Sequence, residues 1–235
     1  MLRRRRRESG DQPSAYAGSM MADQLPARPP TGPWDVADDY PEAERIDCGS
    51  LLIPVREGFD VQINVAEEEG AWVAIVHGES GMQLQAFAAP RSGGLWDEVR
   101  HEIAANIAES GGSCQESDGL AGHELRAEVP VGEVNGTPGQ LQPVRFLGFD
   151  GPRWFLRGVI SDPAATDARA GAPFTEVFAD VVVVRGDYPA PPREQLEIRL
   201  PEEARQALEA QLAEEGAGWD LPDPFTRGPE ISETR

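Results

Sequence analysis

Lysine is absent from this chain, whose 21 basic residues are all arginines set against 41 Asp and Glu, for a formal net charge of -20. The absence of lysine excludes Schiff-base catalysis and a P-loop, because both need a lysine ammonium group. The large negative charge disfavours nucleic acid or an anionic membrane as the partner of the main domain, since the phosphates would be repelled. A cationic partner is easier to accommodate.

Cysteine and histidine are also scarce. Cys48 and Cys114 lie far apart and form neither a disulfide framework nor a CxxC motif. His77, His101 and His123 match no HExxH or paired-ligand spacing. The chain contains no GxSxG, GxGxxG or Walker pattern either. We therefore expect no metal and no cofactor.

Long apolar runs are missing as well. No stretch approaches the roughly 20 apolar residues of a membrane span, and the arginine run at residues 3–7 is not followed by the apolar segment of a secretory signal. These observations predict a cytoplasmic protein. Weak docking of the Arg3–Arg7 arm to nucleic acid is the only nucleic-acid contact that we expect.

Proline and glycine, with 21 and 25 residues, divide the chain into three parts. Residues 1–47 lack a hydrophobic period and are predicted to be a disordered tail. Residues 48–200 are predicted to form a single α+β domain. Residues 201–235 are predicted to form a short helix and a C-terminal tail.

The domain pattern is a strand meander, a helix, several strands and a second helix. Apolar alternation predicts strands at residues 51–55, 59–65, 71–77, 82–88 and 122–131, and a hairpin of 142–149 with 153–160 around Asp150 and Gly151. A helical segment is predicted to start at Pro173. The four valines 181–184 either continue this helix or form a strand, and propensity alone favours the strand. Since strands and helices do not alternate one to one, we expect a mostly antiparallel β-sheet covered by two or three helices.

The clearest helix follows Gly94. Leu95, Val99, Ile103 and Ile107 recur every four residues, and Arg100, Glu102 and Glu109 are predicted to face water. Ser92 is a candidate N-cap. Exposed N–H groups, flexible glycines and an arginine at such a start are suited to small anions, so the first candidate ligand-binding residues are Arg91, Ser92, Gly93 and Gly94. The alternative is an ordinary capped helix start.

A second candidate set is Arg145, Arg153 and Arg157 on the predicted hairpin. Arg145 and Arg157 are expected to share one sheet face, where they would bind an anion or an acidic peptide. The alternative is that these arginines pair with the chain's own surplus of acids.

Four segments carry a family resemblance: residues 84–96 (LQAFAAPRSGGLW), 143–148 (PVRFLG), 151–158 (GPRWFLRG) and 181–186 (VVVVRG). Over about residues 51–200 the chain resembles an actinobacterial family described as a domain of unknown function. The resemblance implies an actinobacterial, cytoplasmic protein and supplies no reaction and no site. The order of elements also resembles the PsbP-like α/β/α sandwich, a likeness of fold that does not fix function.

The sequence leaves three functions open. A cytosolic binding or scaffold domain with a protein partner is preferred. The rival is an enzyme that holds a small anionic substrate at Arg91–Gly94, and the third is a nucleic-acid accessory protein that acts through residues 3–7.

Overall fold

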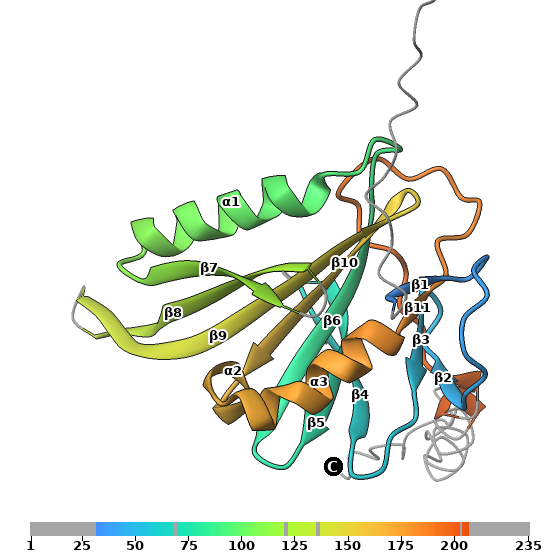
Figure 1. The fold of residues 1–235 in the computed structure, drawn as a ribbon, viewed down its shortest axis with the longest axis horizontal. Coiled ribbons are helices and arrows are strands. Elements are labelled where there is room, and N and C mark those ends of the chain that lie inside the picture. The colour runs from blue at the N-terminus through green and yellow to red at the C-terminus, as the bar shows by residue number, and fades with distance from the viewer. Residues whose placement is uncertain (1–31, 68–69, 120–121, 135–136, 203, 207–235) are drawn as a thin grey trace, which may run out of the picture.

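The computed structural model describes residues 32–67, 70–119, 122–134, 137–202 and 204–206, and Figure 1 shows their arrangement. Of the two expected tails, only residues 32–47 and the start of the C-terminal segment are among the described residues. The arginine run 3–7 lies outside them. The predicted α+β class, with a mostly antiparallel sheet and few helices, is confirmed. Within the described residues, no helix has both the length and the apolar character to cross a membrane.

The larger of the two sheets has seven strands, and all neighbouring pairs in it are antiparallel. In spatial order they are β4 (Asp60–Ala66), β5 (Gly70–His77), β6 (Ser80–Ala88), β10 (Trp154–Ser161), β9 (Thr137–Gly151), β8 (Gly122–Val134) and β7 (Ser113–Gly119). Two meanders, β4–β6 and β7–β10, thus join through β6 and β10. Helix α1 (Leu95–Glu109) carries the chain from the centre of the sheet to its far edge.

Helices cover opposite faces of this sheet. Helix α1 packs on β7, β8 and β9, whereas α2 (Pro163–Thr166) and α3 (Ala168–Asp180) pack on the other side (Figure 1). Neighbouring glycines make both contacts close: a side chain at Gly148 would overlap the Trp96 ring of α1, and one at Gly158 would meet Phe178 of α3. The core accordingly has a main cluster under α3 and a smaller one under α1, where Trp96 stacks on Phe155 at a centroid distance of 5.7 Å.

The smaller sheet has four short strands in the order β1 (Trp34–Asp35), β11 (Val182–Val183), β3 (Leu51–Pro54) and β2 (Arg45–Asp47). Residues 32–47, which we placed in the tail, therefore form part of the fold. Trp154 Nε1 donates to Asp35 Oδ2 at 2.6 Å and ties this sheet to the larger one. Strands of two or three residues are too short to leave a hydrophobic period in the sequence.

Three further elements differ from the prediction. The polar edge strand β7 and the short helix α2 were not predicted. Helix α3 begins at Ala168, capped by the Asp167 side chain, so Pro173 lies inside the helix rather than at its start. The valine run does form a strand, β11.

Helix α1 has the predicted bounds within a residue or two, but one of its polar residues is buried. Arg100 is only 5% exposed, because its guanidinium donates to Asp97 Oδ1 at 2.9 Å and to Glu116 Oε1 on β7 at 3.1 Å. The expectation that Arg100 faces water was wrong, since its partner Glu116 comes from a strand that the sequence did not reveal.

Candidate functional site

The start of α1, our first candidate site, already holds a carboxylate of the chain itself. Asp150 on β9 accepts from the Trp96 N–H with both oxygens at 3.2 Å. Burial raises the pKa of Asp150, and hydrogen bonds from the N–H groups of Trp96, Leu95 and Gly94 partly offset that rise. An external anion at this helix end would have to displace Asp150.

The cap of α1 also differs from the prediction. The N-cap is Gly94, in the left-handed region at φ 82°; it has no side chain to cap the helix, and Asp150 of β9 binds the Trp96 N–H instead. Ser92 is exposed and is not the cap, and Gly93 lies in a turn closed by its N–H on the Pro90 carbonyl. Arg91 is exposed and makes no ion pair among the described residues.

The second candidate set is not brought together. Arg145 pairs across the ladder with Ile160 and Arg157 with Gly148, so the two arginines lie on opposite faces of the sheet. The expectation of a shared face was wrong. The turn of the hairpin is also Pro152–Arg153 rather than Asp150–Gly151, because Gly151 pairs with Trp154.

Arg145 is committed to a buried ion pair. Its Nε and Nη2 donate to the two oxygens of Glu124 at 2.8 Å each, and Nη2 also reaches Thr175 Oγ1 on α3 at 3.2 Å. Arg157 lies on the α1 face, where its guanidinium sits 5.3 Å above the centre of the Phe87 ring and donates to Gln85. Arg145 therefore pairs with an acid of the chain itself, which is the alternative that the sequence analysis gave for this set of arginines.

Arg153, the third member, lies in the turn between β9 and β10, and this turn is at one end of the molecule (Figure 1). Its carbonyl accepts from the Ala89 N–H at 2.9 Å and from Arg185 Nε at 3.2 Å. Arg91 lies two residues beyond Ala89 on the loop to α1. We call these residues, Arg91, Arg153 and Arg185, the arginine end.

The members of the arginine end form no ion pair among the described residues, although the Asp187 carboxylate lines the same hollow as Arg153 and Arg185. Among the described residues, none of its members contacts a carboxylate within 4.0 Å, whereas seven other arginines do: Arg45, Arg56, Arg100, Arg145, Arg193, Arg199 and Arg205. Arg153 and Arg185 line a hollow of about 480 Å³ together with Tyr188, which is 76% exposed. Guanidinium groups bind carboxylates and other anions through charge-assisted hydrogen bonds, so this end of the domain is a candidate place for an external anion.

The backbone of Arg153 is strained at this place. Its φ is 61°, in the left-handed region that non-glycine residues rarely adopt. In a two-residue turn that begins with proline, this second position favours glycine or asparagine. Backbone strain of this kind often occurs at functional sites.

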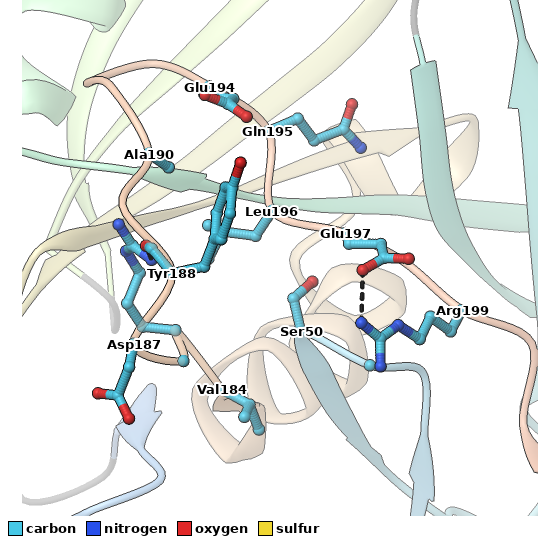
Figure 2. A pocket seen from close by; sticks show the side chains of 13 residues that line it. Ser50, Val184, Asp187, Tyr188, Ala190, Glu194, Gln195, Leu196, Glu197 and Arg199 are labelled. Carbon is cyan, nitrogen blue, oxygen red and sulfur yellow. Dashed lines mark hydrogen bonds and ion pairs between the residues drawn. The ribbon is translucent and has the colours of Figure 1, made fainter.

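A second hollow of about 560 Å³ opens on the other side of the Tyr188 loop, between the smaller sheet and residues 194–199 (Figure 2). Ser50 lies in its wall, 5% exposed, with its N–H on the Glu197 carbonyl and its carbonyl on the Val184 N–H. Its Oγ has no hydrogen-bond partner in the part of the chain that the structure describes. A buried hydroxyl without a partner costs about 1–3 kcal/mol, so this one needs an explanation.

Sequence reasoning missed most of both hollows. The prolines at 189, 191 and 192 predict only a stiff linker over residues 189–192, yet the segment 184–199 around it supplies Arg185, Tyr188 and most of the walls. An exposed tyrosine beside prolines was the available signal. Nothing in the sequence marks Ser50.

The histidines and cysteines lie apart from these hollows. His77 contacts the Gly58 carbonyl, His101 the Asp97 carbonyl and His123 the Asp118 carboxylate. Burial raises the pKa of the Cys48 thiol to about 11. Within the described ranges, no group of three or more His, Cys, Asp and Glu side chains is arranged to hold a metal ion.

The fold is that of an antiparallel α+β domain with two surface hollows beside the segment 184–199. The chain belongs to the family described as "Protein of unknown function (DUF3710)", whose model matches residues 32–207. This match confirms the resemblance to a domain of unknown function, and it begins where the described fold begins. Neither the curated proteins nor the solved structures gave a match, so the PsbP-like arrangement stays a prediction.

Proposed function

We propose that this protein is a non-catalytic, cytosolic binding domain that recognises an acidic segment of a protein partner at the arginine end. The observation that carries the proposal is that the exposed guanidinium groups of Arg91 and Arg153 have no carboxylate partner within the described residues of a chain whose net charge is -20. Charge-assisted hydrogen bonds from arginine suit carboxylates, which they bind in a bidentate way. Tyr188 adds an exposed aromatic surface beside them.

The overall negative charge does not prevent such binding. At physiological salt the Debye length is about 8 Å, so acids farther away are largely screened while the adjacent guanidinium groups act at contact distance. Added salt weakens the local attraction and the long-range repulsion together. We therefore expect the affinity for an acidic peptide to change little between low and moderate salt, unlike that of a basic protein.

The two alternatives have less support in the geometry. The enzyme hypothesis needs the helix start at Arg91–Gly94, where the Asp150 carboxylate already binds the N–H groups. The nucleic-acid hypothesis depends on residues 3–7, which lie outside the described residues.

The test compares two double substitutions in the full chain. Arg91→Ala with Arg153→Ala removes two exposed guanidinium groups of the arginine end, and Arg126→Ala with Arg169→Ala removes two exposed ones elsewhere. Each pair changes the formal net charge by the same two units, from -20 to -22. The probe is a fluorescent oligoglutamate peptide, with oligoglutamine as the uncharged control.

The first double variant is expected to weaken oligoglutamate binding by roughly five- to thirty-fold, since each exposed ion pair contributes up to about 1 kcal/mol. The second is expected to bind like the wild type. Equal weakening by both pairs would show that only the overall charge matters, and equal affinity of all three proteins would remove the arginine end from the interaction.

A further inference from the structure

The hollow at Ser50 has a fixed polar group that no part of the described chain uses. Both backbone groups of Ser50 are hydrogen-bonded, at 3.0 Å to Glu197 and 2.9 Å to Val184, so the main chain that carries the hydroxyl is held in place. Figure 2 shows its hydroxyl directed into the space between Tyr188 and the Glu197–Arg199 ion pair. A hydroxyl held in this way can both donate to and accept from a bound molecule.

The charges around the hollow argue against a strongly charged ligand. Three carboxylates and two guanidinium groups line it: Asp187, Glu194, Glu197, Arg185 and Arg199. Arg199 is neutralised by Glu197 at 2.5 Å, and Arg185 donates to the carbonyls of Arg153 and Tyr188. Figure 2 shows the Asp187 carboxylate directed away from Ser50, which leaves Glu194 and Glu197 against Arg185 and Arg199, so the charges inside the hollow balance.

The remaining surfaces suit a molecule with polar edges and apolar faces. The Tyr188 ring stands at one side of the space, and Leu196, Val184 and Ala190 supply aliphatic surface (Figure 2). The Glu194 carboxylate makes no hydrogen bond or ion pair among the described residues and can accept from a hydroxyl donor. The volume of about 560 Å³ lies within the range of small-molecule sites.

We infer that the hollow at Ser50 binds a neutral, hydroxyl-rich ring compound of the size of a small sugar. Its hydroxyl groups donate to Glu194 and exchange a hydrogen bond with Ser50, and its C–H face packs on Tyr188. This site is distinct from the binding of an acidic segment, because its defining group, Ser50, does not line the hollow of the arginine end.

The test uses one ring in three charge states: glucose, glucosamine and glucuronate, each titrated into the full-length protein and followed by saturation-transfer NMR. Glucose is expected to give a saturable signal, and the cationic and anionic sugars are expected to bind more weakly. Saturation matters because sugars also stabilise proteins without binding, through exclusion from the surface. Tighter binding of either charged sugar, or no saturable glucose signal, would overturn the inference.

Two substitutions localise the signal. Ser50→Ala removes only the unpartnered hydroxyl and Tyr188→Ala removes an exposed ring, so both variants are expected to fold. Each is expected to weaken glucose binding by about fivefold or more. Unchanged glucose affinity in Ser50→Ala would place the sugar elsewhere.

The sugar site and the binding of an acidic segment can be refuted independently of each other. Arg153→Gly is expected to leave glucose binding intact while it weakens oligoglutamate binding, and Ser50→Ala is expected to do the reverse. If both variants lost both ligands, the hollows would be one coupled site and the separate sugar site would be refuted.

Discussion

Arg153 offers a substitution whose effects on stability and on binding are expected to have opposite signs. It lies at the second position of the tight turn between β9 and β10 with φ 61°, and its side chain is exposed. Replacing it with glycine removes the steric conflict of the left-handed conformation. The same change removes a guanidinium group from the arginine end.

The magnitude follows from two opposing terms. A left-handed conformation costs a non-glycine residue roughly 1–2 kcal/mol, whereas glycine adds about 0.5–1 kcal/mol of chain entropy to the unfolded state. The net expectation for Arg153→Gly is a stabilisation of about 0.5–1 kcal/mol. For a domain of this size this corresponds to a rise in Tm of about 1–4 °C.

Arg153→Ala is the matched control. It also removes the guanidinium group, but it keeps a Cβ in the left-handed region and should stay within about 0.5 kcal/mol of the wild type. Both variants are expected to lose affinity for oligoglutamate to the same extent. Urea melts followed by tryptophan fluorescence measure the stabilities, since the buried Trp154 directly follows the turn.

Two results would refute this reasoning. If alanine stabilises the protein as much as glycine does, the backbone conformation is not the source of the effect. If the glycine variant binds oligoglutamate as tightly as the wild type, the guanidinium of Arg153 takes no part in binding, and its place in a strained turn has no functional explanation.

Three other predictions follow from buried groups. Trp96→Ala should destabilise the domain by about 3–5 kcal/mol in urea melts, because the ring is 5% exposed and its Nε1 donates to the His123 carbonyl at 2.7 Å; a loss below about 1 kcal/mol would contradict the packing of α1. In a thiol assay at pH 8, Cys48 should react far more slowly than the half-buried Cys114, since burial raises the pKa of the Cys48 thiol to about 11; Cys114→Ser should abolish the fast phase. Burial raises the pKa of Asp150 in the folded state. The contribution of Asp150 to the free energy of unfolding should therefore fall as the pH rises from 3.8, the ordinary pKa of the group, through the raised pKa. Asp150→Asn should remove this part of the pH dependence of stability, and an unchanged profile would contradict the assignment.

Hydrophobic periodicity predicted the elements whose side chains alternate between core and solvent. The strands β4, β5 and β6 and the helix α1 are of this kind, because one face of each packs on the core. Strand β7 is a polar edge strand with few apolar residues, so periodicity gives no signal for it. The burial of Arg100 depends on Glu116 of that strand, which makes it a long-range effect.

The sheet face on which Arg157 lies, in contrast to the burial of Arg100, could have been predicted from the sequence. In a hairpin with a two-residue turn, odd-numbered residues of one strand pair with even-numbered residues of the other. Arg145 and Arg157 therefore fall on opposite faces whether the turn is at 150–151 or, as the structure has it, at 152–153. Turn length alone, rather than tertiary contacts, decides this point.

The pairing of the segment 184–199 with the larger sheet could not be predicted from the sequence, because it depends on where the neighbouring strands of that sheet end. Strand β5 pairs with β6 only as far as Leu84. Beyond it, residues 193–196 take the place of β5: Leu196 N–H donates to the Ala86 carbonyl and Ala88 N–H to the Glu194 carbonyl, both at 2.8 Å. The proline-rich segment thus covers an edge that would otherwise be open to association with other chains.

This edge pairing also positions both candidate sites. The segment that completes β6 places Tyr188 between the two hollows and Arg185 on the carbonyl of Arg153, while Ser50 is fixed by Glu197. A ligand in either hollow contacts a segment held to the sheet by a few backbone hydrogen bonds. Binding should therefore slow hydrogen exchange at the amides of Ala88 and Leu196, which open when this segment leaves the sheet, more than at the centre of β10.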